Sequence, residues 1–236
     1  MNPSTSRRGS RAPSAFSGPL STVRYDVNGV RFDMVRVPSG RFIDGEGSAR
    51  RELLVSRPFE IGVAPVTQAL WRAVMGSSPS KFRGEDQPVE QVSGDDVREL
   101  MGALAARGFP GFRLPTEAEW AWAARCGAPT RWAGAYRAKV VAVANASQTE
   151  PVAGLSSSVV GAFDFSGNVF EWVDDWHRQV PPAGVDVQGP ASGSNRVYRG
   201  GSWGSVSRLA RVAFRLSVAP GRRNYFLGVR LLRTAP

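Results

Sequence analysis

Glycine and proline interrupt this chain so often that they limit what it can fold into. Its 236 residues include 26 glycines and 17 prolines. Both residue types concentrate in turns, because glycine adopts left-handed backbone conformations and proline fixes φ. The chain therefore favours many turns and long loops over a helical bundle. Its length suits one medium-sized domain that encloses its own hydrophobic core.

Alternation of apolar and polar residues predicts the first strands. Residues 30–37 follow this pattern, and a turn at 38–40 leads to residues 41–43, which we expect to be the hairpin partner. Residues 1–22 are rich in Ser, Pro, Gly and Arg, a composition that cannot repay the entropy of ordering. We predict a flexible tail there, followed by one domain over residues 23–236.

Capping signals predict up to three helices. Thr67 is expected to cap a helix over about 68–75, and Ser93 a second one that ends before Gly108. The sharpest signal is the capping box formed by Thr116 and Glu119. The apolar face expected for the second helix comprises Val97, Leu100, Met101 and Leu104. Helices followed by short strands among loops indicate the α+β class, with two to three helices and short antiparallel strands.

Residue counts exclude several kinds of chemistry. One cysteine, Cys126, excludes an internal disulfide and is expected to be buried and inert. One histidine, His177, argues against a metal site of imidazole and thiolate ligands. No apolar stretch could span a membrane and no secretory signal is evident, so a cytoplasmic location is expected by default.

The net charge of +10 is carried almost entirely by arginine, since Lys81 and Lys139 are the only lysines. The arginines are spread along the chain and form no compact basic run. Nucleic acid is therefore an improbable partner, and arginine-rich codon usage is a sufficient explanation. The excess charge could still favour an acidic ligand.

Several motifs, taken together and in order, resemble the formylglycine-generating enzyme/sulfatase-modifying family over roughly residues 31–230. They are Phe32–Gly40, Pro65–Ala69, Pro88–Ser93, Arg113–Trp120, Asp164–Trp172, Arg199–Trp203 and Gly228–Arg230. The resemblance implies the C-type lectin fold of that family. Five tryptophans are expected to supply core area for a fold so poor in regular structure: Trp120, Trp122, Trp172, Trp176 and Trp203.

The resemblance also implies which chemistry to look for. Members that oxidise a substrate cysteine bind copper through two cysteines a few residues after the Arg-Gly-Gly-Ser motif, because soft thiolates suit copper(I). The corresponding residues 203–211 contain no cysteine. We therefore expect a chain without oxidase activity that is used for binding. An active site moved to Asp175 and His177 is the enzymatic alternative.

Calcium is the one cofactor that the resemblance suggests, near residues 167–171. The ligands would be the side-chain carbonyl of Asn168, the main-chain carbonyl of Val169 and the carboxylate of Glu171, all hard oxygens. The alternative is a turn held by Asn168, with Glu171 in an internal salt bridge. A second family site near residues 145–148 lacks an evident acidic partner.

Residues 203–228 resemble the variable region of diversity-generating retroelement proteins, in which codons between fixed framework residues are rewritten. The framework here would be Gly200–Trp203, Arg208, Arg211, Ala213, Arg215, Pro220–Gly221, Arg223 and Leu227–Arg230. The positions matching rewritten ones are Gly204, Ser205, Val206, Leu209, Phe214, Leu216, Ser217, Val218, Ala219, Arg222, Asn224, Tyr225 and Phe226. We refer to this set as the display positions.

Apolar display positions follow no strand or helix period and stand among Gly, Pro and Arg, as loop residues do. Exposed together, they would form an apolar patch edged by arginine, as in protein-binding hot spots. Phe214, Leu216, Tyr225 and Phe226 would be the anchors, and Arg222 would attract an acidic protein or other macromolecule. The main alternative is an inactive family member used as an interaction module, with these residues in its core.

Overall fold

The computed structural model describes residues 20–125, 127–134, 142–155 and 157–234. It is an α+β domain with three α-helices and mostly antiparallel strands. Residues 1–19 of the expected tail lie outside the described residues, as does Cys126. Within the described ranges, no helix is both long enough and apolar enough to cross a membrane.

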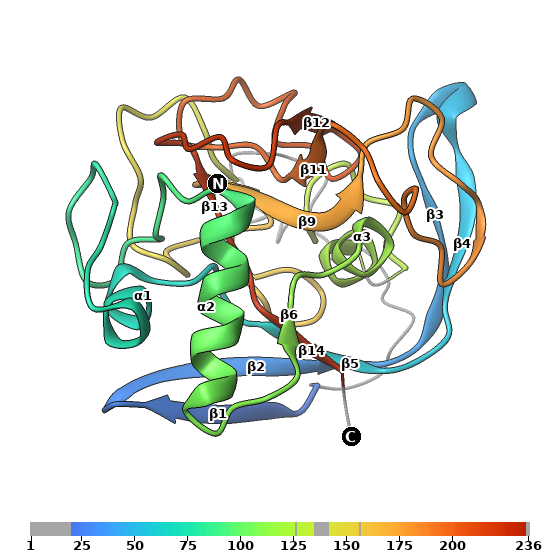
Figure 1. The fold of residues 1–236 in the computed structure, drawn as a ribbon. Helices are drawn as coiled ribbons and strands as arrows, with labels where there is room; N and C mark the ends of the chain where they lie inside the picture. Colours follow the sequence, from blue (N-terminus) through green and yellow to red (C-terminus); the bar gives the residue numbers. More distant parts are fainter. Residues whose placement is uncertain (1–19, 126, 135–141, 156, 235–236) are drawn as a thin grey trace, which may run out of the picture.

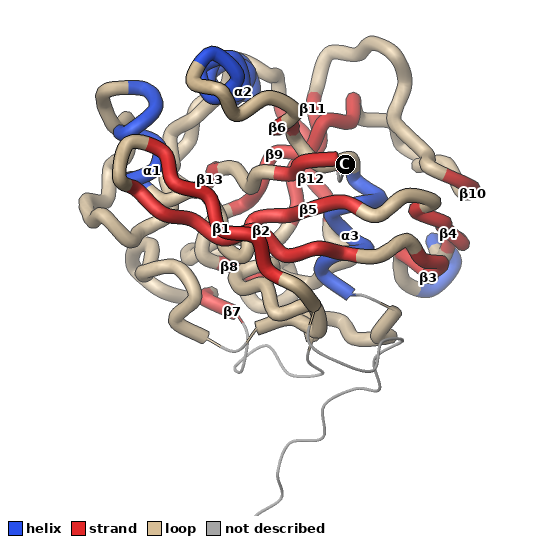
Figure 2. Tube along the Cα trace, turned by 90° about the horizontal axis from the view of Figure 1, so that it is seen from below, coloured by secondary structure: helices blue, strands red, loops and turns tan. Residues whose placement is uncertain are grey.

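The largest sheet has five strands in the order β1-β2-β5-β14-β6. They are β1 (Thr22–Val27), β2 (Val30–Val37), β5 (Phe59–Gly62), β14 (Leu232–Thr234) and β6 (Phe112–Arg113). Strand β14 pairs with both β5 and β6, so the last strand of the chain lies inside the sheet that contains its first strand. Figure 2 views the molecule from the side of this sheet, with β1, β2 and β5 next to one another.

The predicted hairpin between residues 30–37 and 41–43 is wrong. Strand β2 pairs with β1 across a tight turn at Asn28 and Gly29, both of which have positive φ. Asn-Gly is a preferred sequence for such a turn, because both central residues must be left-handed. Strand β3 (Gly40–Asp44) pairs instead with β4 (Arg51–Val55), in a second sheet that β10 (Gly184–Val185) completes.

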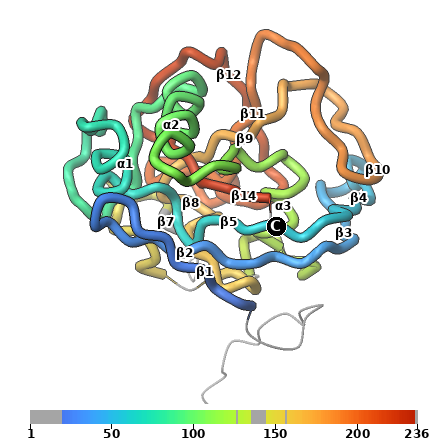
Figure 3. The backbone as a smooth tube through the Cα atoms, turned by 60° about the horizontal axis from the view of Figure 1, so that its bottom comes forward, coloured from blue at the N-terminus to red at the C-terminus, as the bar shows by residue number. Residues whose placement is uncertain are grey.

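A third sheet, in the order β12-β11-β9-β13, lies at the opposite end of the molecule from β1 and β2 (Figure 1). It consists of β12 (Arg215–Val218), β11 (Arg196–Arg199), β9 (Phe170–Trp176) and β13 (Leu227–Gly228). The short pair β7 (Ala142–Val143) and β8 (Ser166–Gly167) and the 3-10 turn η1 (Gly47–Ala49) complete the elements. Figure 3 shows the connection from β9 to β11 arching out to bring β10 beside β4.

All three predicted helices form, and their caps explain where they begin. Thr67 accepts from the amide of Leu70 at the start of α1 (Gln68–Met75). Ser93 forms a reciprocal capping box at the start of α2 (Gly94–Ala106). Thr116 does the same with Glu119 at the start of α3 (Glu117–Arg125). Such local bonds satisfy amides that a helix leaves unpaired at its first turn.

The core divides into two clusters. One surrounds α3, and the other lies between α1, α2 and the third sheet. Trp120, Trp122 and Trp172 are fully buried, as expected. Trp176 and Trp203 are only half-buried, so the prediction that they are core residues is wrong. In place of a core position, Trp203 lies at the edge of the surface described next.

Candidate functional site

The segment from Gly200 to Gly228 crosses the end of the molecule that carries the third sheet (Figure 1). It leaves β11, forms a long loop, returns as β12 antiparallel to β11, turns again and enters β13 parallel to β9. The segment is therefore fixed by backbone pairing at its start, middle and end. Residues 216–218 belong to the edge strand β12, so the expectation that the whole segment is loop is wrong there.

The first turn of this segment depends on a close backbone approach. Gly201 has a φ of +80°, and a Cβ on it would lie 2.6 Å from the Cα of Ala210. Ser205 donates its amide to the carbonyl of Ser202, and its hydroxyl accepts from the amide of Ser202 at 3.0 Å. The amide of Trp203 donates to the carbonyl of Asn168 at 2.8 Å. The loop is therefore anchored to the family motif around Asn168.

Buried ion pairs hold the same segment from beneath. The guanidinium of Arg199 is fully buried and donates to the carboxylate of Glu117 and the carbonyl of Val212. Arg215 also donates to Glu117, at 2.8 and 3.1 Å. Burial alone would raise the pKa of Glu117, but the two guanidiniums outweigh it and lower that pKa. A carboxylate at the start of α3 thus holds both Arg199, at the end of β11, and the framework residue Arg215.

The display positions lie mostly on the surface. Gly204, Val206, Leu216, Ala219, Arg222 and Tyr225 are exposed. Leu209, Phe214, Ser217, Val218, Asn224 and Phe226 are half-buried. Among the large apolar ones, Val206, Leu216 and Tyr225 are 53%, 36% and 41% exposed. Ser205 is the exception: it is 5% exposed, and its hydroxyl is used inside the turn, so it cannot be presented to a ligand.

An aromatic cluster at the edge of this surface includes two residues that the sequence did not indicate. The ring centroid of Trp203 lies 5.2 Å from that of Phe82 and 5.9 Å from that of Tyr225. The ammonium of Lys81 lies 4.7 Å from the centroid of Tyr225. Lys81 and Phe82 come from the loop after α1. The only hint in the sequence was the rarity of lysine in an arginine-rich chain.

Comparison with protein families accounts for this arrangement. The model of the sulfatase-modifying factor enzyme 1-like domain matches residues 26–235, nearly the whole described chain. The chain belongs to this family. Its fold is accordingly the C-type lectin fold of the formylglycine-generating-enzyme type, as the ordered motifs predicted.

Proteins similar to this chain include a variable protein, an enzyme and a protein kinase. The structure of Treponema denticola variable protein 1 superimposes with a TM-score of 0.84 and 30% identity, covering 91% of this chain and 99% of that one. A formylglycine-generating enzyme of Thermomonospora curvata is 29% identical over 247 residues, or 84% of this chain and 80% of that enzyme. A Chlamydia caviae serine/threonine-protein kinase pkn1 is 30% identical over 84% of this chain. The chain spans only 37% of that kinase's length. Family membership thus fixes the fold and leaves the activity open.

The residues that could hold calcium in this family member are already engaged. The carboxylate of Glu171 accepts from Trp120 at 2.6 Å and from Arg230 at 2.7 Å, with all three side chains buried. The side chain of Asn168 bonds both the amide and the carbonyl of Glu150. A divalent cation at Glu171 would be repelled by the guanidinium beside it. Asn168, Val169 and Glu171 therefore do not fit calcium as they are placed, and the alternative of a turn with an internal salt bridge matches the contacts.

The alternative active site at Asp175 and His177 is not assembled either. The carboxylate oxygens of Asp175 accept from the amides of Glu117 and Gly189, each at 2.6 Å. Burial is the main cause that raises its pKa, to about 6. His177 follows the end of β9 and is exposed. Asp175 thus caps the start of α3, which is a structural task.

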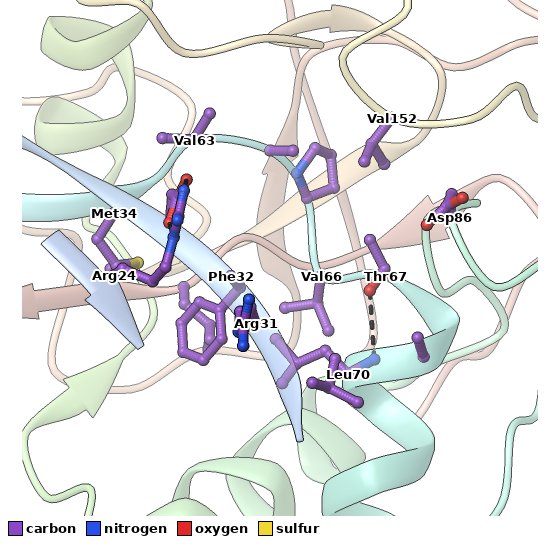
Figure 4. A pocket seen from close by; sticks show the side chains of 17 residues that line it. Arg24, Arg31, Phe32, Met34, Val63, Val66, Thr67, Leu70, Asp86 and Val152 are labelled. Atoms are coloured by element: carbon purple, nitrogen blue, oxygen red, sulfur yellow. Dashed lines mark hydrogen bonds and ion pairs between the residues drawn. The ribbon is translucent and has the colours of Figure 1, made fainter. Parts of the chain in front are cut away.

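A cavity of about 460 Å³ has no display position in its lining (Figure 4). The β1–β2 hairpin, residues 62–67 and α1 line it, mainly with apolar side chains such as Met34 and Leu70. Its polar groups already serve the fold, since Arg24 pairs with Asp33 and Thr67 caps α1.

Proposed function

We propose that this chain is a non-catalytic ligand-binding protein that displays a diversified surface on a C-type lectin fold. The binding site is the surface formed by the display positions other than Ser205. One observation carries the proposal: the display positions other than Ser205 are exposed or half-buried and lie together on one segment, whose flanks Gly200–Ser202 and Leu227–Arg230 are buried. Framework positions inside the segment, such as Arg208 and Arg223, are exposed as well. The ligand would be a protein or another macromolecule.

An ordered backbone that carries exposed side chains is well suited to binding. Backbone pairing in β12 and β13 and the buried pairs of Arg199 and Arg215 order the segment before any ligand arrives. A new side chain then needs to supply contacts only, because the cost of ordering the backbone is already met. The likeness to Treponema denticola variable protein 1 supports the same function for this chain.

The exposed apolar side chains are the expected anchors. Val206, Leu216 and Tyr225 present apolar area to solvent without belonging to a core cluster. Few residues carry most of the energy of an interface, and aromatic residues are prominent among them. Phe226 is half-buried and its ring stacks edge-on against Phe170, so it contributes only its outer part.

Sequencing the locus in many independent isolates tests this function. We expect substitutions to concentrate in the codons of the display positions, with a near-copy carrying adenines there beside a reverse-transcriptase gene. Ser205 should vary less than its neighbours unless its replacement keeps the turn. If the segment varies no more than the buried core and no copy exists, the proposal fails. The chain would then be an inactive family module with a fixed partner.

A further inference from the structure

We infer that the binding surface extends beyond the display positions onto the loop after α1, where Lys81, Phe82 and Trp203 form a fixed anchor for an acidic protein segment. This inference rests on the proposed function and adds the chemistry of the partner. We refer to these three residues, with the ring of Tyr225, as the anchor.

The anchor is continuous although its parts are distant in the chain. The rings of Phe82 and Trp203 meet edge to face, and the ring of Tyr225 is next to Trp203. The ammonium of Lys81 lies over both ends, 5.3 Å from the centroid of Phe82 and 4.7 Å from that of Tyr225. A ligand that contacts the display residue Tyr225 therefore meets Lys81 as well.

Hydrogen bonds fix the loop that carries Lys81 and Phe82. The buried carboxylate of Glu90 accepts from the amides of both residues, at 2.5 and 2.9 Å. The side chain of Gln68 donates to the carbonyl of Phe82 at 2.6 Å. The indole of Trp203 donates to the carbonyl of Tyr225 at 3.2 Å. The anchor is thus preorganised, and Tyr225 is its only display position.

Positive side chains without a direct ion pair favour a negatively charged partner. Within the described ranges, neither Lys81 nor Arg222, three residues before Tyr225, forms a direct ion pair with a carboxylate. The buried carboxylate of Glu90 beneath the loop attracts Lys81 without bonding its ammonium. Of the cations around Lys81 and Arg222, Arg223 pairs with Asp96 and Arg98 with Asp95, whereas Arg83 likewise has no ion pair among the described residues. A carboxylate placed at Lys81 would bring its neighbouring apolar side chains over Trp203 and Tyr225. Complementary charge of this kind speeds association and selects partners.

A protein segment fits better than nucleic acid because the surrounding charge is mixed. The hollow beside Asn224, about 420 Å³, is lined by Asp96 and Glu99 as well as by Arg223. A phosphate backbone carries uniform negative charge and binds by releasing counterions from a run of cations. Here the charges alternate in sign and Arg223 is already paired with Asp96, so no run of free cations is offered to a phosphate backbone. A protein, by contrast, can present a single carboxylate at Lys81.

Selection of random peptides tests the inference without a known partner. A displayed library of random peptides is selected on the full-length chain, and the affinity of the recovered peptides is measured by fluorescence anisotropy. We expect them to be rich in Asp and Glu next to an apolar residue. Lys81→Ala should weaken binding about 10-fold and Lys81→Glu more, whereas Lys81→Arg should stay within about 3-fold of the original.

The matched control is Arg107→Ala, which removes the same charge at the far end of α2. It should leave binding unchanged, and circular dichroism should show every variant folded. Peptides without acidic excess, or with equal affinity for Lys81→Glu, overturn the inference. If those peptides still lose binding on Leu216→Ser, the proposed function survives. If no recovered peptide depends on the display positions, the proposed function fails too. Stronger binding to duplex DNA than to any peptide would also overturn the inference.

Discussion

Two pairs of arginines among the last forty or so residues have opposite surroundings. Arg199 and Arg230 are fully buried and bind the carboxylates of Glu117 and Glu171. Arg208 and Arg222 are exposed, and in the part of the chain that the structure describes they bind no carboxylate. The same residue type thus forms buried ion pairs in the core and carries unpaired charge at the surface, at the framework position Arg208 as well as at the display position Arg222.

The difference shows why exposed positions can vary while buried ion pairs cannot. A buried arginine left without its carboxylate, or the reverse, is an uncompensated charge in a medium that solvates it poorly. An exposed arginine is solvated by water whether or not it is paired. Substitutions should therefore be tolerated at exposed positions and not at the buried ion pairs. The following predictions test how sharp this boundary between buried and exposed residues is.

The largest effect is expected from Arg230→Ala. It removes the hydrogen bonds of Arg230 to Glu171 and to the carbonyls of Gly62 and Phe163, and it strands a buried carboxylate. The free energy of unfolding should fall by about 3–5 kcal/mol. Urea denaturation measures it, with Arg222→Ala as the exposed control, which should leave the midpoint unchanged. Equal effects of the two substitutions would remove the distinction between buried and exposed arginines.

Adding one methyl group to either of two nearby glycines, Gly201 and Gly204, should have very different effects on stability. Gly201→Ala forces a left-handed alanine against the backbone of Ala210, and we expect a loss of about 3 kcal/mol. At the display position Gly204 nothing lies within 4 Å of an added Cβ, so Gly204→Ala should change stability by less than about 0.5 kcal/mol. Thermal melts of the two variants, side by side, test this. A Gly204→Ala variant as unstable as Gly201→Ala would place residue 204 in the framework.

The helices could be predicted from the sequence, whereas the pairing of the strands could not. The caps at Thr67, Ser93 and Thr116 lie within three residues of the amides they satisfy, so all three helices were predictable. The partner of residues 41–43 is the next strand along the chain, at residues 52–54, and it was predicted wrongly. The Asn28–Gly29 turn that pairs β1 with β2 was also missed, although it is equally local. Motif order identified the fold, because it constrains many distant contacts together.

Site residues show the same limit. The motif around Glu171 allowed either calcium or a salt bridge, and the choice depends on Arg230, which lies 59 positions away in the chain. Lys81 and Phe82 join the surface only because the fold brings the loop after α1 against Trp203. No periodicity or spacing in the sequence encodes either contact.

Asp175 offers a smaller and sharper test, because it is a framework carboxylate held by amides rather than by arginine. Burial raises its pKa from 3.8 to about 6, so between these values the folded state binds more protons than the unfolded state. This group's contribution to stability is therefore fully present below about pH 4 and is lost as the pH rises to about 6. Asp175→Asn abolishes this titration. Relative to Asp175→Asn, the wild type should lose about 2–3 kcal/mol between pH 4 and pH 7, as followed by urea denaturation. A constant difference would mean that Asp175 titrates normally. The buried part of the domain would then hold an ionised carboxylate without an arginine beside it. The contrast between buried and exposed charges would be weaker.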